Sequence, residues 1–131
     1  MISPTKKGIR GTDGFGSGSY GARRGDHIHK GVDYICIPGQ MVVMPIAGVI
    51  LREARPYAKD SRWSGVLIKG KNAEIKMFYL SPDKTLFGQN LNEGAMIGIA
   101  QDISKKYPGI TPHIHLEIVS INPEIVKDVL K

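Results

Sequence analysis

Cysteine is almost absent from the sequence, which has a single one, Cys36, among 131 residues. One thiol cannot form a disulfide within the chain, so a disulfide framework is excluded as the basis of the fold. The surrounding segment, VDYICIP, is apolar and rich in strand-forming residues. Such a setting favours a buried structural thiol over a nucleophile.

Long apolar runs are missing as well. No stretch approaches the ~20 consecutive apolar residues that a membrane-spanning helix needs. The first residues, MISPTKKGIRG, lack the apolar segment of a conventional secretory signal. We therefore expect no membrane insertion and no conventional signal within this chain.

Acidic and aromatic residues are few. There are 12 acidic against 18 basic residues, which gives a formal net charge of +6, and aromatic residues make up 7% of the chain. The charge favours an anionic partner such as nucleic acid, acidic polysaccharide or bacterial cell wall, although many basic proteins bind nothing acidic. The basic residues are scattered and no nucleic-acid-binding motif accompanies them. Nucleic acid is therefore not an expected partner.

The length and composition are those of one globular domain, which we expect to span residues 1–131. Sixteen glycines and eight prolines are spread through the chain and indicate many turns between short strands. Residues 1–17 belong to an irregular, glycine-containing segment and are expected to form an extended N-terminal arm.

Alternating or β-branched segments predict the strands. They are residues 32–37, 41–54 in two pieces broken near Pro45 and Gly48, 66–70, 74–81, 95–100 and 113–119. The connections are too short for helical crossovers, so we predict an all-β, mainly antiparallel fold with long loops. Asn122 as N-cap and Pro123 at the first helical position favour a short C-terminal helix over residues 122–131.

Two short motifs carry the chemistry. The tripeptide HIH at 113–115 lies in a predicted strand, so both imidazoles should point to one face. The pentapeptide HKGVD at 29–33 places a histidine and an aspartate four residues apart, on a loop that enters a strand. Two imidazoles and a carboxylate are usual ligands of a zinc ion that keeps one coordination position open. We predict that the fold brings His29, Asp33 and His115 together.

The order of the motifs resembles the lysostaphin-type zinc endopeptidases. HKGVD and its strand are followed by a Pro-Gly turn, VVMPIAGVI, a hairpin, EGAMIGIA and PHIHLEI. In the family, an H-x-G-x-D segment, a P-x-x-G-x-V strand, a G-x-x-I-G turn and a final H-x-H-x-E strand occur in that order. The resemblance extends from about Gly18 to Val119 and implies the lysostaphin-type peptidase fold.

The resemblance also implies a role for each residue. His29, Asp33 and His115 would bind one zinc ion per chain. His113 would be the catalytic imidazole that orients or deprotonates the attacking water and supports charge in the tetrahedral intermediate. His27 is expected to face solvent, with contact to the site as the alternative.

One position departs from the family pattern. The family has a second catalytic histidine in a Y-x-H-L segment, whereas this chain has MFYL at 77–80, with Tyr79 in the place of the histidine. Tyrosine cannot act as a base at neutral pH, because its ordinary pKa is about 10. Its hydroxyl can still donate a hydrogen bond to an oxyanion. Tyr79 is therefore predicted as the second catalytic residue, in that role.

A closer resemblance points to a second interpretation. IRGTDGFGSGSYGARR, HKGVDYIC, KMFY and the segment KKYPGI before the final HIHLE look like the leukocyte cell-derived chemotaxin 2 family. Its members are secreted zinc-binding proteins of the same fold that share the tyrosine, carry several disulfides and act in signalling. The alternative function is therefore a catalytically inactive, zinc-stabilised binding or signalling domain.

The first expectation is a zinc metalloendopeptidase that hydrolyses peptide cross-links of bacterial peptidoglycan as a monomer. It would act in the periplasm or outside the cell, released by phage lysis or a dedicated secretion machine, or after removal of a signal. A protein partner, such as an immunity protein or a receptor, is the other class of partner to consider.

Overall fold

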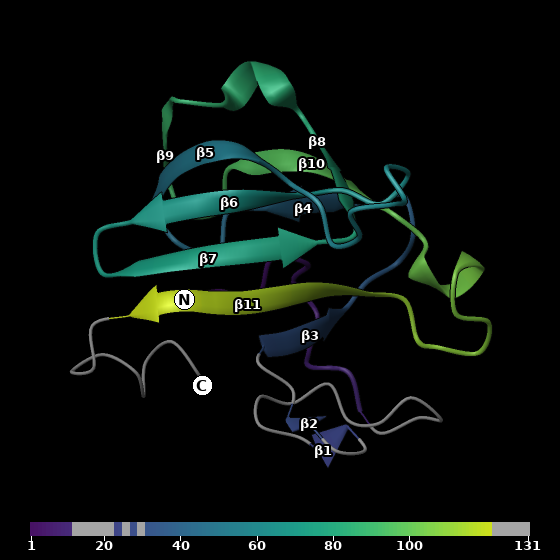
Figure 1. Cartoon of the computed structure of the whole chain (residues 1–131). Helices are drawn as coiled ribbons and strands as arrows, with labels where there is room; N and C mark the ends of the chain where they lie inside the picture. The colour runs from purple at the N-terminus through teal and green to yellow at the C-terminus, as the bar shows by residue number, and fades with distance from the viewer. Residues whose placement is uncertain (12–22, 25–26, 29–30, 122–131) are drawn as a thin grey trace.

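The computed structural model describes residues 1–11, 23–24, 27–28 and 31–121. Its main sheet has six strands in the order β3-β11-β7-β6-β5-β9 (Figure 1). These strands are Gly31–Ile35 (β3), His113–Ile121 (β11), Ala73–Phe78 (β7), Gly65–Gly70 (β6), Gly48–Ala54 (β5) and Asn90–Leu91 (β9). All of its strand pairs are antiparallel.

A second sheet of three strands, in the order β4-β10-β8, packs behind the first (Figure 1). Its strands are Met41–Val43 (β4), Met96–Ala100 (β10) and Leu80–Pro82 (β8). Arg23–Arg24 (β1) and His27–Ile28 (β2) form a separate two-stranded ladder. The only helical elements in the described ranges are the single 3-10 turns Lys84–Leu86 (η1) and Ile103–Lys105 (η2), and no helix there is long and apolar enough to cross a membrane.

The core lies between the two larger sheets because their strands alternate in burial. On β11, Ile114 and Leu116 are fully buried, whereas His115 between them is partly exposed on the opposite face. Ile75 and Met77 alternate in the same way on β7. Period-two alternation therefore directs the apolar residues inward and leaves the chemistry-bearing residues on the outer face of the large sheet.

The all-β, mainly antiparallel prediction is confirmed. The predicted break between residues 41 and 54 separates β4 from β5, and the hairpin of β6 and β7 turns at residues 71–72. The connection between the segments predicted as strands at 74–81 and 95–100 contains η1 and the short strand β9, neither of which was predicted. The predicted C-terminal helix, residues 122–131, lies outside the described residues.

The strand predicted over residues 74–81 is wrong in one respect, because it is interrupted at Tyr79. This residue has a φ of 77°, in the left-handed region that non-glycine residues rarely adopt. There the chain leaves the six-stranded sheet after β7 and enters the three-stranded sheet as β8. Tyr79 thus connects β7 of the six-stranded sheet to β8 of the three-stranded sheet, and it belongs to neither strand.

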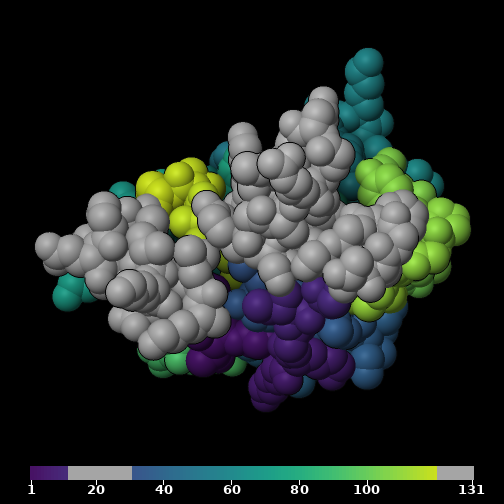
Figure 2. Space-filling view, turned by 90° about the horizontal axis from the view of Figure 1, so that it is seen from below, coloured from purple at the N-terminus to yellow at the C-terminus, as the bar shows by residue number. Residues whose placement is uncertain are grey.

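Residues 1–11 lie against the body of the protein along β3 and β4. The Ile35 amide donates to the Gly8 carbonyl at 2.9 Å, and the Val43 amide donates to the Pro4 carbonyl at 2.9 Å. Figure 2 shows this segment in purple against the blue strands. We call residues 1–11 the N-terminal strap. The arm predicted over residues 1–17 extends beyond it, outside the described residues.

Candidate metal centre and catalytic site

Asp33 and His115 face each other across neighbouring strands. The antiparallel register of β3 and β11 makes them direct partners. Their side chains meet with Asp33 Oδ1 2.7 Å from His115 Nδ1. Asp33 is 2% exposed, so this carboxylate is almost completely removed from water. Two of the three predicted metal ligands are therefore side by side.

The His115 ring is fixed on its other edge as well. Its Nε2 lies 3.2 Å from Glu117 Oε1, and its ring stacks on Phe78 with a centroid distance of 6.0 Å and an interplanar angle of 3°. Burial lowers the pKa of His115, but the hydrogen bonds to Asp33 and Glu117 outweigh it and raise that pKa to about 9. A carboxylate on the far ring nitrogen is a typical support for a metal-ligating histidine.

His113 presents the opposite ring nitrogen to the site. Its Nδ1 lies 2.7 Å from the Thr111 carbonyl oxygen, which can only accept a hydrogen bond, so this nitrogen donates. Its Nε2 lies 3.7 Å from Asp33 Oδ2. Burial lowers the pKa of His113, which favours the neutral imidazole. A neutral ring with Nδ1 protonated keeps the lone pair of Nε2 available to accept a proton.

Tyr79 lies beside His113 at the rim of the site. The two rings meet edge to face with a centroid distance of 5.5 Å. The Tyr79 hydroxyl is 3.0 Å from that of Tyr57, which in turn accepts from the Tyr107 hydroxyl at 2.9 Å. Burial raises the pKa of Tyr79 to about 12. The phenol therefore stays protonated near neutral pH, which suits a hydrogen-bond donor and excludes a base.

Several of these neighbours were not predicted from the sequence. Arg10, counted there among scattered basic residues, is 1% exposed and pairs with Asp33. Tyr57 and Tyr107 converge on Tyr79 from loops distant in sequence, and no local pattern marks them. Glu117 was within reach of sequence reasoning, since it follows His115 by two residues on the same strand face.

The described side chains of Asp33 and His115 have the donor atoms that a zinc ion binds. Asp33 Oδ1 and His115 Nδ1 are suitable donor atoms that converge. Within residues 1–11 and 31–121, no three His, Cys, Asp or Glu side chains are arranged to hold a metal ion. A complete site therefore needs a further ligand, and His29, the third predicted one, lies outside the described residues, as does the His27 side chain.

Gly31, in the middle of HKGVD, allows β3 to approach β11 closely. A Cβ atom there would lie 2.2 Å from the Leu116 carbonyl oxygen and 3.1 Å from His115 Cε1. We predict that Gly31→Ala destabilises the protein by about 2 kcal/mol or more, because the two strands must separate. Urea unfolding measures the effect.

Gly11→Ala is the matched control, because no atom in the part of the chain that the structure describes lies within 4 Å of a Cβ at that position. It is expected to be neutral or to stabilise by about 0.4–1 kcal/mol through the unfolded chain. Equal unfolding midpoints for the two variants would contradict the close approach of β3 and β11.

Cys36 is 4% exposed, and burial together with the nearby Asp102 charge raises its pKa to about 11. At pH 8 roughly one thiol in a thousand is then ionised, against about one in ten for a thiol with the reference pKa of 9.0. We predict that a disulfide reagent such as Ellman's reagent labels the folded protein at least ~100-fold more slowly than the urea-unfolded protein. Similar rates in the two states would show that the thiol is accessible.

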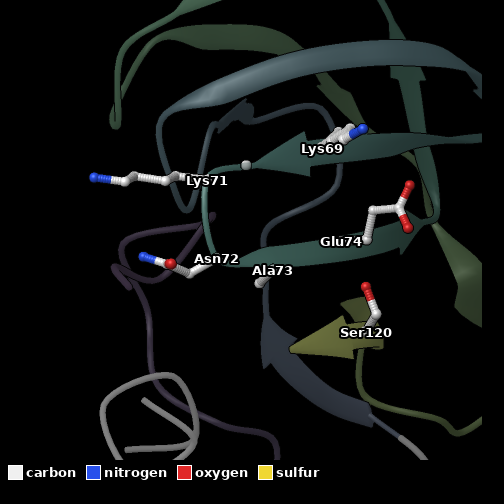
Figure 3. Close-up of a pocket in the computed structure, with 7 residues that line it drawn as sticks. Lys69, Lys71, Asn72, Ala73, Glu74 and Ser120 are labelled. Carbon is white, nitrogen blue, oxygen red and sulfur yellow. The ribbon is translucent and has the colours of Figure 1, made fainter. Parts of the chain in front are cut away.

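A hollow of about 240 Å³ lies at the turn between β6 and β7 (Figure 3). It is lined by Lys69, Gly70, Lys71, Asn72, Ala73, Glu74 and Ser120. Figure 3 shows Lys71 extending away from this turn. Lys69 and Glu74 are cross-strand partners of opposite charge. Asp33, Tyr79, His113 and His115, the described residues of the predicted site, do not line the hollow, and we assign it no role in the chemistry.

Comparison with known proteins finds relatives by sequence and a similar solved structure. No protein-family model matches the chain. The chain is 40% identical over 110 residues to leukocyte cell-derived chemotaxin-2 of Bos taurus, covering 83% of this chain and 72% of the relative. It is 34% identical over 116 residues to the protein of that name from Mus musculus, covering 88% and 76%. Myeloid protein 1 of Gallus gallus is 34% identical over 119 residues, which are 88% of this chain but 36% of the relative.

A solved structure from Pseudomonas aeruginosa, described as a candidate M23 peptidase, superimposes with a TM-score of 0.54 at 19% identity. The match covers 92% of this chain and about half, 49%, of that one. At this identity it establishes the fold and nothing of the activity, so the lysostaphin-type peptidase fold is confirmed. On the evidence of its curated relatives, the chain belongs to the leukocyte cell-derived chemotaxin-2 family.

Proposed function

We propose that the protein is a zinc-dependent metalloendopeptidase that hydrolyses peptide cross-links of bacterial peptidoglycan. The observation that carries the proposal is the convergence of two imidazoles on one buried carboxylate. His115 Nδ1 lies 2.7 Å from Asp33, and His113 Nε2 lies 3.7 Å from it, with the opposite nitrogen of each ring held by another group. A site that served only to stabilise the fold would not need a neutral imidazole with an available nitrogen.

Each residue has a distinct task in this proposal. Asp33 and His115, together with His29, would hold the zinc ion, which when bound supplies a Lewis acid for the scissile carbonyl and for water. His113 would accept a proton at Nε2, because its Nδ1 proton is committed to the Thr111 carbonyl. Tyr79 would donate a hydrogen bond from its hydroxyl to the developing oxyanion.

The hydroxyl chain supports the role of Tyr79 as a donor. Tyr107 donates to Tyr57, so the Tyr57 proton is available to the Tyr79 oxygen. The Tyr79 proton is then left for an acceptor in the site, and successive hydrogen bonds polarise one another. Tyr79 would thus compensate in part for the missing histidine.

The proposed substrate and location are based on the positive net charge of the chain and on its lysostaphin-type peptidase fold. A net charge of +6 suits an anionic cell wall. We propose that the protein acts as a monomer on peptidoglycan in the periplasm or outside the cell, without nucleic acid and without insertion into a membrane. An immunity protein or a receptor is the class of protein partner that this location would allow.

The test is digestion of purified peptidoglycans with different cross-bridges by the zinc-loaded protein. The proposal predicts new free amino groups and smaller muropeptides, which chelation of the metal abolishes. Protein that carries zinc yet releases no fragments from any wall type would refute hydrolysis and leave the metal site intact.

Tyr79 also favours a second candidate function, a zinc-stabilised binding or signalling domain without catalysis. Two of the relatives described above are named as chemotaxins, and the Tyr79 hydroxyl is within hydrogen-bond distance of that of Tyr57. Under this alternative the parent shows no hydrolysis, and Tyr79→His creates some by supplying an imidazole. Under the peptidase proposal the parent is active, and Tyr79→Phe lowers its rate by about 10-fold or more through loss of the donor.

A further inference from the structure

Arg10 is an unusual residue to find in the interior. It is 1% exposed, and removing such a cation from water costs several kcal/mol unless it is paired. Its partner is Asp33, with Nη2 3.0 Å and Nε 3.3 Å from Oδ2. Two donors of one guanidinium therefore meet a single carboxylate oxygen of a predicted metal ligand.

In this pairing the two oxygens of the Asp33 carboxylate have different hydrogen-bond partners among the described residues. Oδ2 accepts from Arg10, while Oδ1 is 2.7 Å from His115 Nδ1. The carboxylate plane is thereby fixed, and Oδ1 is the oxygen directed at the other predicted ligand. A carboxylate without such a partner is free to rotate or to offer both oxygens to a metal ion.

The backbone holds Arg10 in this position. Its amide donates to the Asp33 carbonyl at 2.6 Å, and the adjacent Ile9 forms a bridge with Tyr34. The N-terminal strap thus pairs with the edge of β3 that faces away from β11. Because the main chain is already paired, the guanidinium reaches Asp33 with little further ordering.

We propose that Arg10 is a positioning residue of the metal centre, holding Asp33 so that it binds the metal ion through Oδ1 alone. This inference rests on the zinc site of the proposed function. Residues that orient a ligating carboxylate typically contribute 10–100-fold to metal affinity. The strap is then part of the metal site, although it contributes no ligand.

The test compares zinc affinity, measured by competition with a chromophoric chelator, in the parent, Arg10→Met and Arg10→Lys. We expect Arg10→Met to bind zinc about 10–100-fold more weakly. Arg10→Lys keeps the charge but loses the two-donor fork, and it should bind about 10-fold more weakly. Lys7→Met removes one positive charge from the same strap, leaves the Arg10–Asp33 pair in place, and should bind like the parent.

The visible spectrum of the Co²⁺-loaded proteins gives a readout of geometry. The parent should show the intense bands of four-coordinate Co²⁺, and Arg10→Met the weaker bands of higher coordination, as Asp33 offers both oxygens. If Arg10→Met does not fold, Arg10→Lys decides by the same two measurements.

Parent-like affinity and spectra in the folded Arg10 variants would overturn the inference and leave the proposed function standing. If the Arg10 variants bind zinc more weakly than the parent and the parent cleaves no peptide, the inference is upheld and hydrolysis is refuted. A parent that binds no zinc would refute both.

Discussion

Replacing His115 with alanine is expected to remove zinc from the protein, from one ion per chain to none after dialysis. His115 Nδ1 is one of the two described donor atoms that converge, at 2.7 Å from Asp33 Oδ1. Its loss leaves two ligands in the proposed set, too few for a stable protein site. The affinity should fall by more than the ~100-fold that follows loss of a group supporting a ligand. Elemental analysis of protein purified without chelator measures the content.

Two variants on the same strand calibrate this result. Glu117→Gln replaces the carboxylate 3.2 Å from His115 Nε2 and should weaken zinc binding by about 10–100-fold without abolishing it. Val119→Ala changes a residue that is 49% exposed and should retain one zinc per chain. If His115→Ala kept a full zinc ion, the metal would have to be bound elsewhere.

Replacing His113 with alanine should have a different outcome, namely loss of hydrolysis with zinc retained. His113 offers Nε2 to the site and makes no predicted bond to the metal ion. Loss of a general base typically lowers the rate by 10²–10⁴-fold. The rate of release of free amino groups from peptidoglycan and the zinc content of the same sample check both halves of the prediction.

His113 is 4% exposed, so its truncation also creates a cavity. His113→Gln, a polar replacement of similar size, separates the two effects, because it fills the space without supplying a base. Both variants should be inactive, and His113→Gln should be the more stable in urea. Parent-like hydrolysis by a folded His113→Gln variant would show that His113 is not catalytic.

Sequence reasoning succeeded where one local rule decides the structure. Period-two alternation placed His113 and His115 on one face of β11, and the apolar segments predicted most strands. The motif HKGVD indicated a loop that enters a strand. The structure adds the reason for glycine at position 31, because a Cβ atom there would lie 2.2 Å from the Leu116 carbonyl oxygen.

It failed where tertiary structure overrides local pattern. Nothing in the sequence of the segment 74–81 reveals that Tyr79 takes a left-handed conformation as the chain passes between sheets. Arg10 resembles any surface arginine in sequence, and the pairing with Asp33 that makes its burial possible joins residues 23 positions apart. Tyr57 and Tyr107, which reach Tyr79 from distant loops, likewise cannot be identified as its neighbours without the three-dimensional structure.

The metal centre is tested most directly by crystallising the protein with zinc and collecting anomalous diffraction at the zinc edge. We predict one strong peak per chain, about 2.0–2.2 Å from Asp33 Oδ1 and from His115 Nδ1, with His29 as a third ligand and Arg10 on Oδ2. A map with no peak between Asp33 and His115, or with zinc bound only at other residues, would contradict the site.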